Sequence, residues 1–544
     1  MSEETFGREP VVYVQIDQDF CNLTYGEAPC NAQVGVTGQR KCFNTRRTCQ
    51  DTDNYDRGNL TLTFTKRTED IDLDGLYVIP SLNSVSTVPT EINPGGNSAD
   101  SGALGSRASV TVKFVDHPHS DTAVDKYRNE RDYIATERGT FWSKWIARNP
   151  YYINRELRIY EGYRGQSLSE MRQRTYVIDT IEGPGSSGEV SIKAKDVLKL
   201  ADDDTAQAPR PSQGELESDI DESSSEITIS RFQSEDDYPA SGGIVVINDE
   251  LIRYSNASYD TNFCTLTGLT RGSEDTEADT HDAEDRVQLC LEYDQKRVDD
   301  IIFELLTDYG SVPADYINRD DWAAEYDVWL NQYSLSTIIA EPTGVTTLVG
   351  ELSEQCIFSL WWDERFRQVR LEAIKPASDA PVLFNDNQNF IAGSTALKAK
   401  AKERISQIWF FYGLRDPTER TDSEQNFSRI YIRADAAAES ANEYGDQKIR
   451  KVFSRWLSTE AQVINASARL LSRFRDVPRY LNVNVDAKDR ESWTGDVVDV
   501  ETPRRTIAAR PTPRKQKAVG GQITKAHLDQ MKTNLIGGHN GRLD

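Results

Sequence analysis

Four of the chain's seven cysteines lie close together near its start, with the spacing C-x8-C-x11-C-x6-C; they are Cys21, Cys30, Cys42 and Cys49. Four thiols on one short segment that also carries glycines can reach a single centre, so the segment is constrained to fold around whatever joins the sulfurs. The other three cysteines are far apart in apolar surroundings and are predicted to be core residues: Cys264, Cys290 and Cys356.

The spacing narrows the kind of centre. Structural zinc sites usually take their cysteines in pairs two to four residues apart, and this segment has no such pair. Longer loops suit a larger iron-sulfur core, whose thiolates are spread around it. A thiolate cluster is an anion, and the flanking basic residues favour one: Arg40, Lys41, Arg46 and Arg47.

Two disulfides or free thiols are the alternatives to a metal or cluster. The first ten residues are polar and acidic and lack the apolar stretch of a secretion leader. We therefore expect synthesis in a reducing cytoplasm, which favours a metal or cluster over disulfides.

Composition limits the class of protein. With 88 acidic against 63 basic residues in 544, the net charge is -25, which argues against a general binder of nucleic acid or anionic membranes. No apolar run approaches the roughly 18 residues that span a bilayer, so we predict no membrane-spanning segment. Short alternating runs of Val, Ile, Thr and Tyr predict a mainly β, multidomain chain with some helices.

Six regions are predicted from these patterns. They are an N-terminal region over 1–106 with the cysteines at 21–49, a first β-domain over 107–205, an inserted small β-barrel-like module over 206–295, a helical or mixed domain over 296–389, a second β-domain over 390–502, and a basic C-terminal extension over 503–544 that is either disordered or partner-binding. Residues 81–106 are predicted to be an exposed loop and 201–226 an acidic linker. Amphipathic helices are predicted over 298–309 and 459–474.

No enzymatic motif stands out. The sequence has no Gly-rich phosphate loop, nucleophile elbow or zinc-protease helix, and among so many acids a carboxylate pair is expected by chance. His117, His119 and His281 could ligate a metal but are more typical of hydrogen-bonded turns. A sugar-docking surface is an alternative for four aromatic residues that are more typical of a β-domain core: Trp142, Trp145, Tyr151 and Tyr152.

Several motifs together resemble a known family. The segments 21–30 (CNLTYGEAPC), 37–45 and 48–51, followed by 112–121 (VKFVDHPHSD), 147–152 and 194–200, resemble the tail hub proteins of siphophages and gene transfer agents. The segments 247–254 (INDELIRY) and 266–272 (LTGLTRG), with His281, are similar to a small module common in such hubs. The x8 and x6 separations also resemble those of the iron-sulfur minor tail tip protein of lambda-like phages.

The resemblance implies a structural hub and not an enzyme. Two tube-like β-domains per chain would form a pseudo-sixfold ring in a homotrimer at the tail tip of the virion, assembled in the host cytoplasm. Its partners would be the tail tube or distal tail protein, a central tip or fibre protein, and DNA that passes through the lumen without specific binding. The implied ligands of a four-iron four-sulfur (4Fe-4S) cluster, with zinc as the alternative, are Cys21, Cys30, Cys42 and Cys49. The competing functions are a receptor- or carbohydrate-binding tip protein and an iron-sulfur or hydrolytic enzyme.

Overall fold

The computed structural model describes residues 9–66, 73, 75–88, 90–92, 104–202, 206–234, 237–375, 382–385, 388–485 and 494–501. The C-terminal extension predicted over 503–544 lies outside these residues. The fold is mainly β with some helix and is divided among several sheets, which confirms the predicted fold class. No helix in the described part of the chain is long and apolar enough to cross a membrane.

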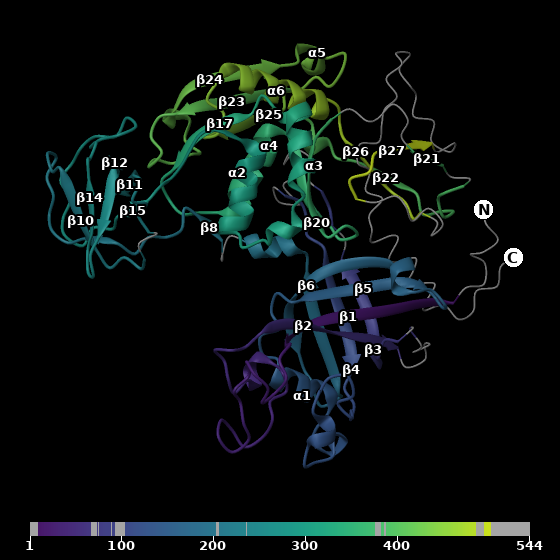
Figure 1. Cartoon of the computed structure of the whole chain (residues 1–544). Helices are drawn as coiled ribbons and strands as arrows, with labels where there is room; N and C mark the ends of the chain where they lie inside the picture. Colours follow the sequence, from purple (N-terminus) through teal and green to yellow (C-terminus); the bar gives the residue numbers. More distant parts are fainter. Residues whose placement is uncertain are drawn as a thin grey trace.

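Seven strands close into a barrel at the N-terminal end of the chain (Figure 1). Their order around it is β1-β2-β3-β4-β7-β6-β5, and every neighbouring pair is antiparallel except β2 and β3. The strands are β1 (Pro10–Cys21), β2 (Arg57–Lys66), β3 (Val78–Val88), β4 (Ser109–Val115), β5 (Glu156–Tyr163), β6 (Arg172–Glu182) and β7 (Glu189–Lys195). Buried residues alternate along β4 and β7, as expected for strands with one face towards a core.

The barrel interior is filled by side chains. Helix α1 (Phe141–Arg148) packs there with Trp142, which is fully buried and stacks on Phe64 with ring centroids 5.3 Å apart. Its indole Nε1 donates to Ser81 Oγ at 3.0 Å, so the one polar atom of the ring is satisfied. A barrel of this size is a packed core and leaves no passage through its centre.

The structure differs from two sequence-based boundaries here. Strands from both sides of residue 106 belong to the one barrel, so the predicted boundary falls inside a domain. Part of the predicted loop over 81–106 is also strand, because β3 continues to Val88 and buries Ser81 and Leu82. A stretch rich in Ser and Thr can pair as a strand when apolar residues alternate with them, and composition alone hides that alternation.

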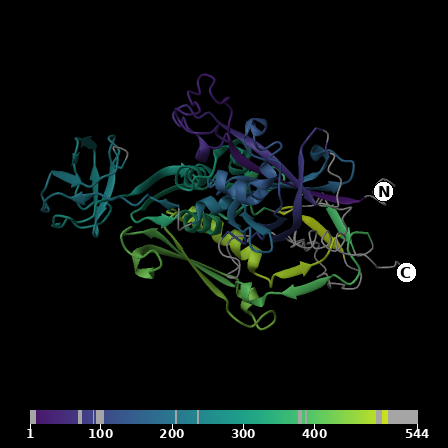
Figure 2. The same cartoon turned by 90° about the horizontal axis from the view of Figure 1, so that it is seen from below.

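The inserted module stands apart from the barrel in both views (Figures 1 and 2). Two small sheets, in the orders β13-β14-β10-β9 and β12-β11-β15, enclose a core of their own. The strands are β9 (Glu215–Leu216), β10 (Glu226–Ser230), β11 (Gly243–Ile247), β12 (Glu250–Tyr254), β13 (Asn256–Tyr259), β14 (Cys264–Thr267) and β15 (Gln288–Leu289). The predicted acidic linker is partly built into the fold, because Ala208, Leu216 and Ile220 are buried.

The helical domain and the second β-domain share one large core. The first contains β16 (Leu291–Arg297), α2 (Val298–Glu304) with a π-helical turn (Leu305–Tyr309), α3 (Arg319–Glu325) with another (Tyr326–Leu330), β17 (Ser334–Ile339), α4 (Val345–Cys356), β19 (Phe358–Asp363) and β20 (Gln368–Ala373). Two short strands, β8 (Gln207–Ala208) and β18 (Thr343–Gly344), pair at its edge. The helix predicted over 298–309 is confirmed as α2 and its π-helical continuation.

Within the described residues, the main sheet of the predicted second β-domain is open. Its order is β24-β23-β25, and α6 packs against β23 and β24, confirming the helix predicted over 459–474. Two further strand pairs lie beside it, β21 with β27 and β22 with β26. The elements are β21 (Val382–Asn385), β22 (Ala396–Ala399), β23 (Gln407–Leu414), β24 (Phe427–Ala434), α5 (Ala436–Glu439), β25 (Ile449–Ser454), α6 (Glu460–Phe474), β26 (Arg479–Asn482) and β27 (Val498–Glu501).

Replacement of Trp142 by alanine should destabilise the barrel by about 4 kcal/mol, because it leaves a large cavity among aromatic rings. Urea unfolding followed by circular dichroism measures the change. Trp329, which is partly exposed on the π-helical turn after α3, is the matched control, and its alanine variant should lose about 1 kcal/mol or less. Equal losses in the two variants would contradict a barrel centred on Trp142.

Candidate cofactor site

The cysteine loop, residues 22–56, joins β1 to β2 and contains little regular structure. Cys21 is the last residue of β1 and lies opposite Arg57 in the ladder, so the barrel fixes one end of the cysteine set. A single 3-10 turn, Arg46–Thr48, interrupts the loop just before Cys49. The structure describes the whole loop, and Ala32 is its one buried hydrophobic residue. Hydrophobic burial of its own therefore cannot account for the order of this loop.

The four cysteines line one cavity. Cys21 is buried and the other three are partly buried, and all seven cysteines of the chain are free thiols. The other residues that line the cavity are Leu23, Tyr25, Ala32, Asn44, Thr45, Gln50, Asp51, Asn54 and Tyr55. The four thiols therefore lie on the wall of one cavity, and none of them is in a disulfide.

Backbone amides are placed to stabilise thiolates at two of these cysteines. Burial raises the pKa of Cys42, and a hydrogen bond from the Asn44 amide lowers it in part. Cys49 has the same arrangement, with burial raising its pKa and the Asp51 amide opposing this. In both cases the other thiols raise the pKa further, so four thiolates together would need a positive centre to share.

The four thiols are spread around the wall of one cavity. Among the described residues, no group of three or more His, Cys, Asp or Glu side chains is placed to hold one metal ion. A zinc ion would need all its sulfurs at about 2.3 Å. Thiols spread around a cavity wall suit an iron-sulfur core, whose four ligands do not converge on one atom. Four cysteine thiols are the donor set that the predicted cluster requires.

Asn44 holds the two halves of the cysteine loop together. Its carbonyl accepts from the Cys21 amide at 2.6 Å, and its Nδ2 donates to the carbonyls of Cys21 and Leu23 at 3.2 and 3.1 Å. The residue adopts φ = 56°, a left-handed conformation that asparagine tolerates better than most residues. Next to it, Thr48 Oγ1 accepts from the Phe43 amide at 3.1 Å, which fixes the turn before Cys49.

Phe43 anchors the loop to the segment that precedes α1 and to α1 itself. Its ring lies between two guanidinium groups, that of Arg131 at 4.0 Å and that of Arg148 at 3.9 Å. Arg131 also donates to the Lys41 and Cys42 carbonyls at 2.7 and 2.9 Å. This anchor was not predicted, because its partners are far apart in the sequence and neither arginine belongs to a motif.

The flanking basic residues do not form a positive pocket around the sulfurs, contrary to the sequence-based expectation. No lysine or arginine is among the described residues that line the cysteine cavity. Lys41 pairs with Glu130, and Arg40 lies 3.5 Å from Asp132. Arg46 stacks over Tyr55 and lowers the pKa of Cys49 from outside the cavity wall. Closeness in sequence to a cysteine does not direct these basic side chains towards the sulfurs.

The histidines are turn residues, as predicted. His119 Nδ1 accepts from the Asp121 amide at 3.0 Å, and its Nε2 lies 3.1 Å from the Tyr77 hydroxyl, so both ring nitrogens have partners. His117 Nδ1 lies 2.9 Å from the Pro118 carbonyl. The Asp121 carboxylate pairs with Lys144 at 2.6 Å and with Arg148 at 2.9 Å, and these partners hold the pKa of Asp121 low against the effect of burial.

Glu250 organises the inserted module. The buried carboxylate accepts from Arg271 at 2.7 and 2.8 Å, from His281 Nε2 at 2.8 Å and from the Gly272 amide at 2.9 Å. These contacts join the two module segments that resemble tail hubs. Burial raises the pKa of Glu250, but the hydrogen bonds outweigh it and lower the pKa to about 2. The network fixes the segment between β14 and β15 on Glu250 of β12, and His281 is one of its hydrogen-bonding members.

The aromatic residues do not form a sugar-docking face. Trp142 and Trp145 are buried in the barrel core, and the Trp145 indole donates to Gln18 Oε1 at 2.6 Å. Tyr152 is partly buried beside Trp145. Tyr151 is exposed, and it alone of the four presents most of its ring to solvent.

No protein-family model and no curated protein matches the chain. Among solved structures it is similar to the tail protein from Neisseria meningitidis MC58, with 10% identity and a TM-score of 0.34 over 74% of this chain and 80% of that chain. It is also similar to prophage tail protein gp18 from Listeria monocytogenes EGD-e, with 9% identity and a TM-score of 0.30 over 76% and 77%. The 43 kDa tail protein of prophage MuSo2 from Shewanella oneidensis matches with 10% identity and a TM-score of 0.24 over 53% and 84%. Similarities of this size carry no argument about function.

Stability of the inserted module should fall in acid through Glu250. Because its pKa is about 2 in the folded protein and 4.5 ordinarily, the charge stabilises the fold above pH 4.5, and this contribution is lost between about pH 4.5 and 2. Glu250→Gln should cost about 2 kcal/mol at pH 7 and flatten the acid dependence. Hydrogen exchange of peptides from 206–295 measures both effects.

Glu274→Gln is the control for that experiment. Glu274 also pairs with an arginine, Arg253 at 3.1 Å, but both side chains are about two-fifths exposed. Its loss should therefore change protection little. An equal loss of protection in the two variants would show that Glu250 does not organise the module.

Proposed function

We propose that this chain is a structural hub protein of a phage tail tip, stabilised by a four-iron four-sulfur cluster. One observation carries the hub assignment: segments that resemble tail hubs, though far apart in sequence, pack against one another at one end of the barrel. The cysteine loop places Phe43 on Arg148, which lies in the resembling segment 147–152. Arg148 in turn pairs with Asp121 of the segment 112–121. Because the segments that resemble tail hub proteins contact one another in the fold, their joint occurrence supports a hub-like architecture for this chain.

The cluster proposal rests on the loop's lack of a hydrophobic core. With Ala32 as its one buried hydrophobic residue, the loop has little to offset the conformational entropy lost on ordering, and a centre bound by four thiolates supplies such a link. Cys21 would hold it from the barrel, and Cys30, Cys42 and Cys49 from the loop. A cluster of this type can transfer single electrons, but here its proposed role is to fix the loop. The amides of Asn44 and Asp51 would stabilise the bound thiolates of Cys42 and Cys49.

A DNA passage would be enclosed by several copies of the chain and not by one barrel. The interior of the seven-stranded barrel is filled, with Trp142 at its centre. A homotrimer that presents two β-domains per chain would surround a wider lumen, and the strong acidic balance of the chain would repel phosphate groups that pass through it. The tail tube or distal tail protein on one side and a tip or fibre protein on the other complete the proposed set of partners.

An enzymatic role and a sugar-binding role have less support. The histidines that could have served catalysis are occupied in turns and in the Glu250 network. Both tryptophans that could have docked a sugar are buried.

Protein produced anaerobically with iron and sulfide should show the broad brown absorbance of an iron-sulfur cluster and contain about four irons per chain. Cysteine-to-serine changes at positions 21, 30, 42 and 49 should each lower the iron content and increase hydrogen exchange within residues 22–56. Cys264→Ser serves as the control, since that thiol is buried in the inserted module far along the chain from the loop. Zinc bound without iron or sulfide would contradict the iron-sulfur cluster. A loop that is ordered without any metal would contradict the iron-sulfur cluster and the zinc alternative alike.

Mass photometry of the purified chain should show a species of three times 61.4 kDa if the hub is a homotrimer. Antibody labelling of phage particles that contain the chain should mark the tail tip. A monomer or dimer together with labelling along the tail would contradict the hub assignment, whereas the outcome of the iron measurement bears on the cluster alone.

A further inference from the structure

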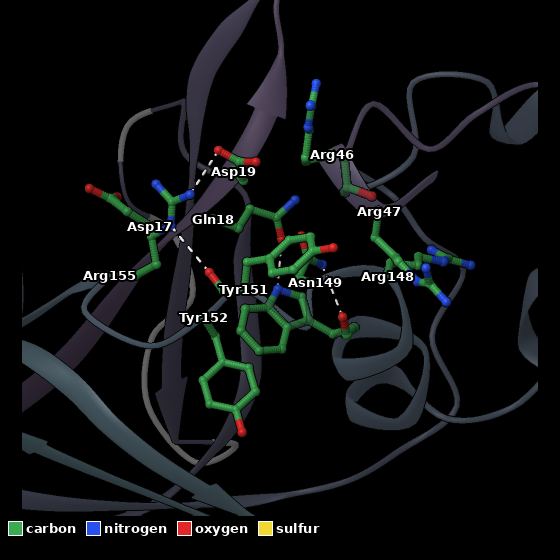
Figure 3. A pocket seen from close by; sticks show the side chains of 12 residues that line it. Asp17, Gln18, Asp19, Arg46, Arg47, Arg148, Asn149, Tyr151, Tyr152 and Arg155 are labelled. Carbon is green, nitrogen blue, oxygen red and sulfur yellow. Dashed lines mark hydrogen bonds and ion pairs between the residues drawn. The ribbon is translucent and has the colours of Figure 1, made fainter. Parts of the chain in front are cut away.

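A second, small cavity lies beside the cysteine cavity, and Figure 3 shows the side chains that line it. Thr45 lines both of them. The wall of the second cavity comes from the end of β1, from the turn at Thr45–Arg47, and from the segment that runs from Trp145 at the end of α1 to Arg155. Three elements that are separate in sequence therefore meet around it.

The cavity carries positive charge that the protein does not neutralise. Four arginines line it, against Asp17 and Asp19. Arg155 pairs with Asp19 at 2.8 Å, Arg148 pairs with Asp121 at 2.9 Å, and Arg46 donates to the Thr52 carbonyl at 2.7 Å. Arg47 is exposed and has no hydrogen bond or ion pair to any residue that the structure describes. In a chain of net charge -25, an unpaired guanidinium at a cavity is a site for an external carboxylate or other anion.

A buried acceptor in the same cavity also lacks a partner. Asn149 is 6% exposed, and its Nδ2 donates to the Trp145 carbonyl at 3.0 Å. Its Oδ1 accepts no hydrogen bond within the described part of the protein. In Figure 3 the Asn149 amide lies between Gln18 and Arg148. A buried acceptor left unpaired costs about 1–3 kcal/mol, so this atom favours an occupant that brings an N–H or O–H donor.

We propose that this cavity binds an acidic segment of a partner polypeptide. A carboxylate of the segment pairs with Arg47, and a backbone N–H donates to Asn149 Oδ1. Sulfate would satisfy the charge but offers no donor, and an uncharged sugar offers donors but no charge. Tyr151 and Ile153, on the segment that follows α1, are 56% and 57% exposed and add apolar contact area beside the cavity. An acidic peptide brings a carboxylate, N–H donors and apolar side chains together.

Fluorescence anisotropy of the full chain with a labelled, alanine- and glycine-based octapeptide that carries two aspartates tests the proposal. The same peptide with asparagines in their place should bind about tenfold more weakly, because the pair with Arg47 is lost. Arg47→Ala should remove the difference between the two peptides. Asn149→Leu should weaken both peptides about fivefold, since it removes the acceptor and keeps the size of the side chain.

Arg40→Ala is the matched control, because Arg40 is an exposed arginine of the same loop that does not line the cavity. It should leave both affinities unchanged. Near-ultraviolet circular dichroism confirms that each variant is folded, and Asn149→Ala replaces the leucine variant if that one is not. Absence of binding at millimolar peptide, equal affinity for the two peptides, or full competition by sulfate with no effect of the Asn149 variant would each overturn the proposal.

Discussion

The contact of Phe43 with the guanidinium groups of Arg131 and Arg148 fixes the cysteine loop on the barrel. Neither arginine is free to move, because buried Asp125 holds Arg131 at 2.8 Å and buried Asp121 holds Arg148 at 2.9 Å. Both aspartates lie in the segment between β4 and α1, so the position of each ion pair is set by that segment. The loop is therefore held by charge and ring contacts at a place where it has almost no hydrophobic surface to bury.

The same contact explains why two cavities lie side by side. Phe43 precedes Asn44 and Thr45, and these two buried residues form the wall of the cysteine cavity. The turn that follows carries Arg46 and Arg47 to the second cavity, whose opposite wall is the end of α1. A displacement of this turn would alter both cavities together, so the order of the cysteine set and the position of Arg47 are physically linked.

Local signals allowed a part of the fold to be predicted. The helix over 459–474 has an apolar stripe and a capping box formed by Thr459 and Gln462, and both depend on neighbouring residues alone. The meeting of the four cysteines follows from their closeness in sequence. Closure of the barrel was not predictable in this way, because the parallel pairing of β2 with β3 and the pairing of β1 with β5 are set by tertiary packing. The orphan acceptor of Asn149 likewise depends on how α1 ends against β1, which no pattern of residues records.

The two β-domains differ in how their strands are arranged: the first is a closed barrel, and the main sheet described in the second is open. Both have strands and one helix that packs on them, and this likeness is visible in the sequence. In the first domain the strands close on themselves and leave no free edge. In the second, β24 and β25 are both edges of a three-stranded sheet, and Ile430, Ile432 and Ile449 on these strands are about half exposed. Exposed apolar side chains on the outer strands of a sheet are unfavourable in water, so within the described residues this sheet, unlike the closed barrel, presents edges at which further strands can pair.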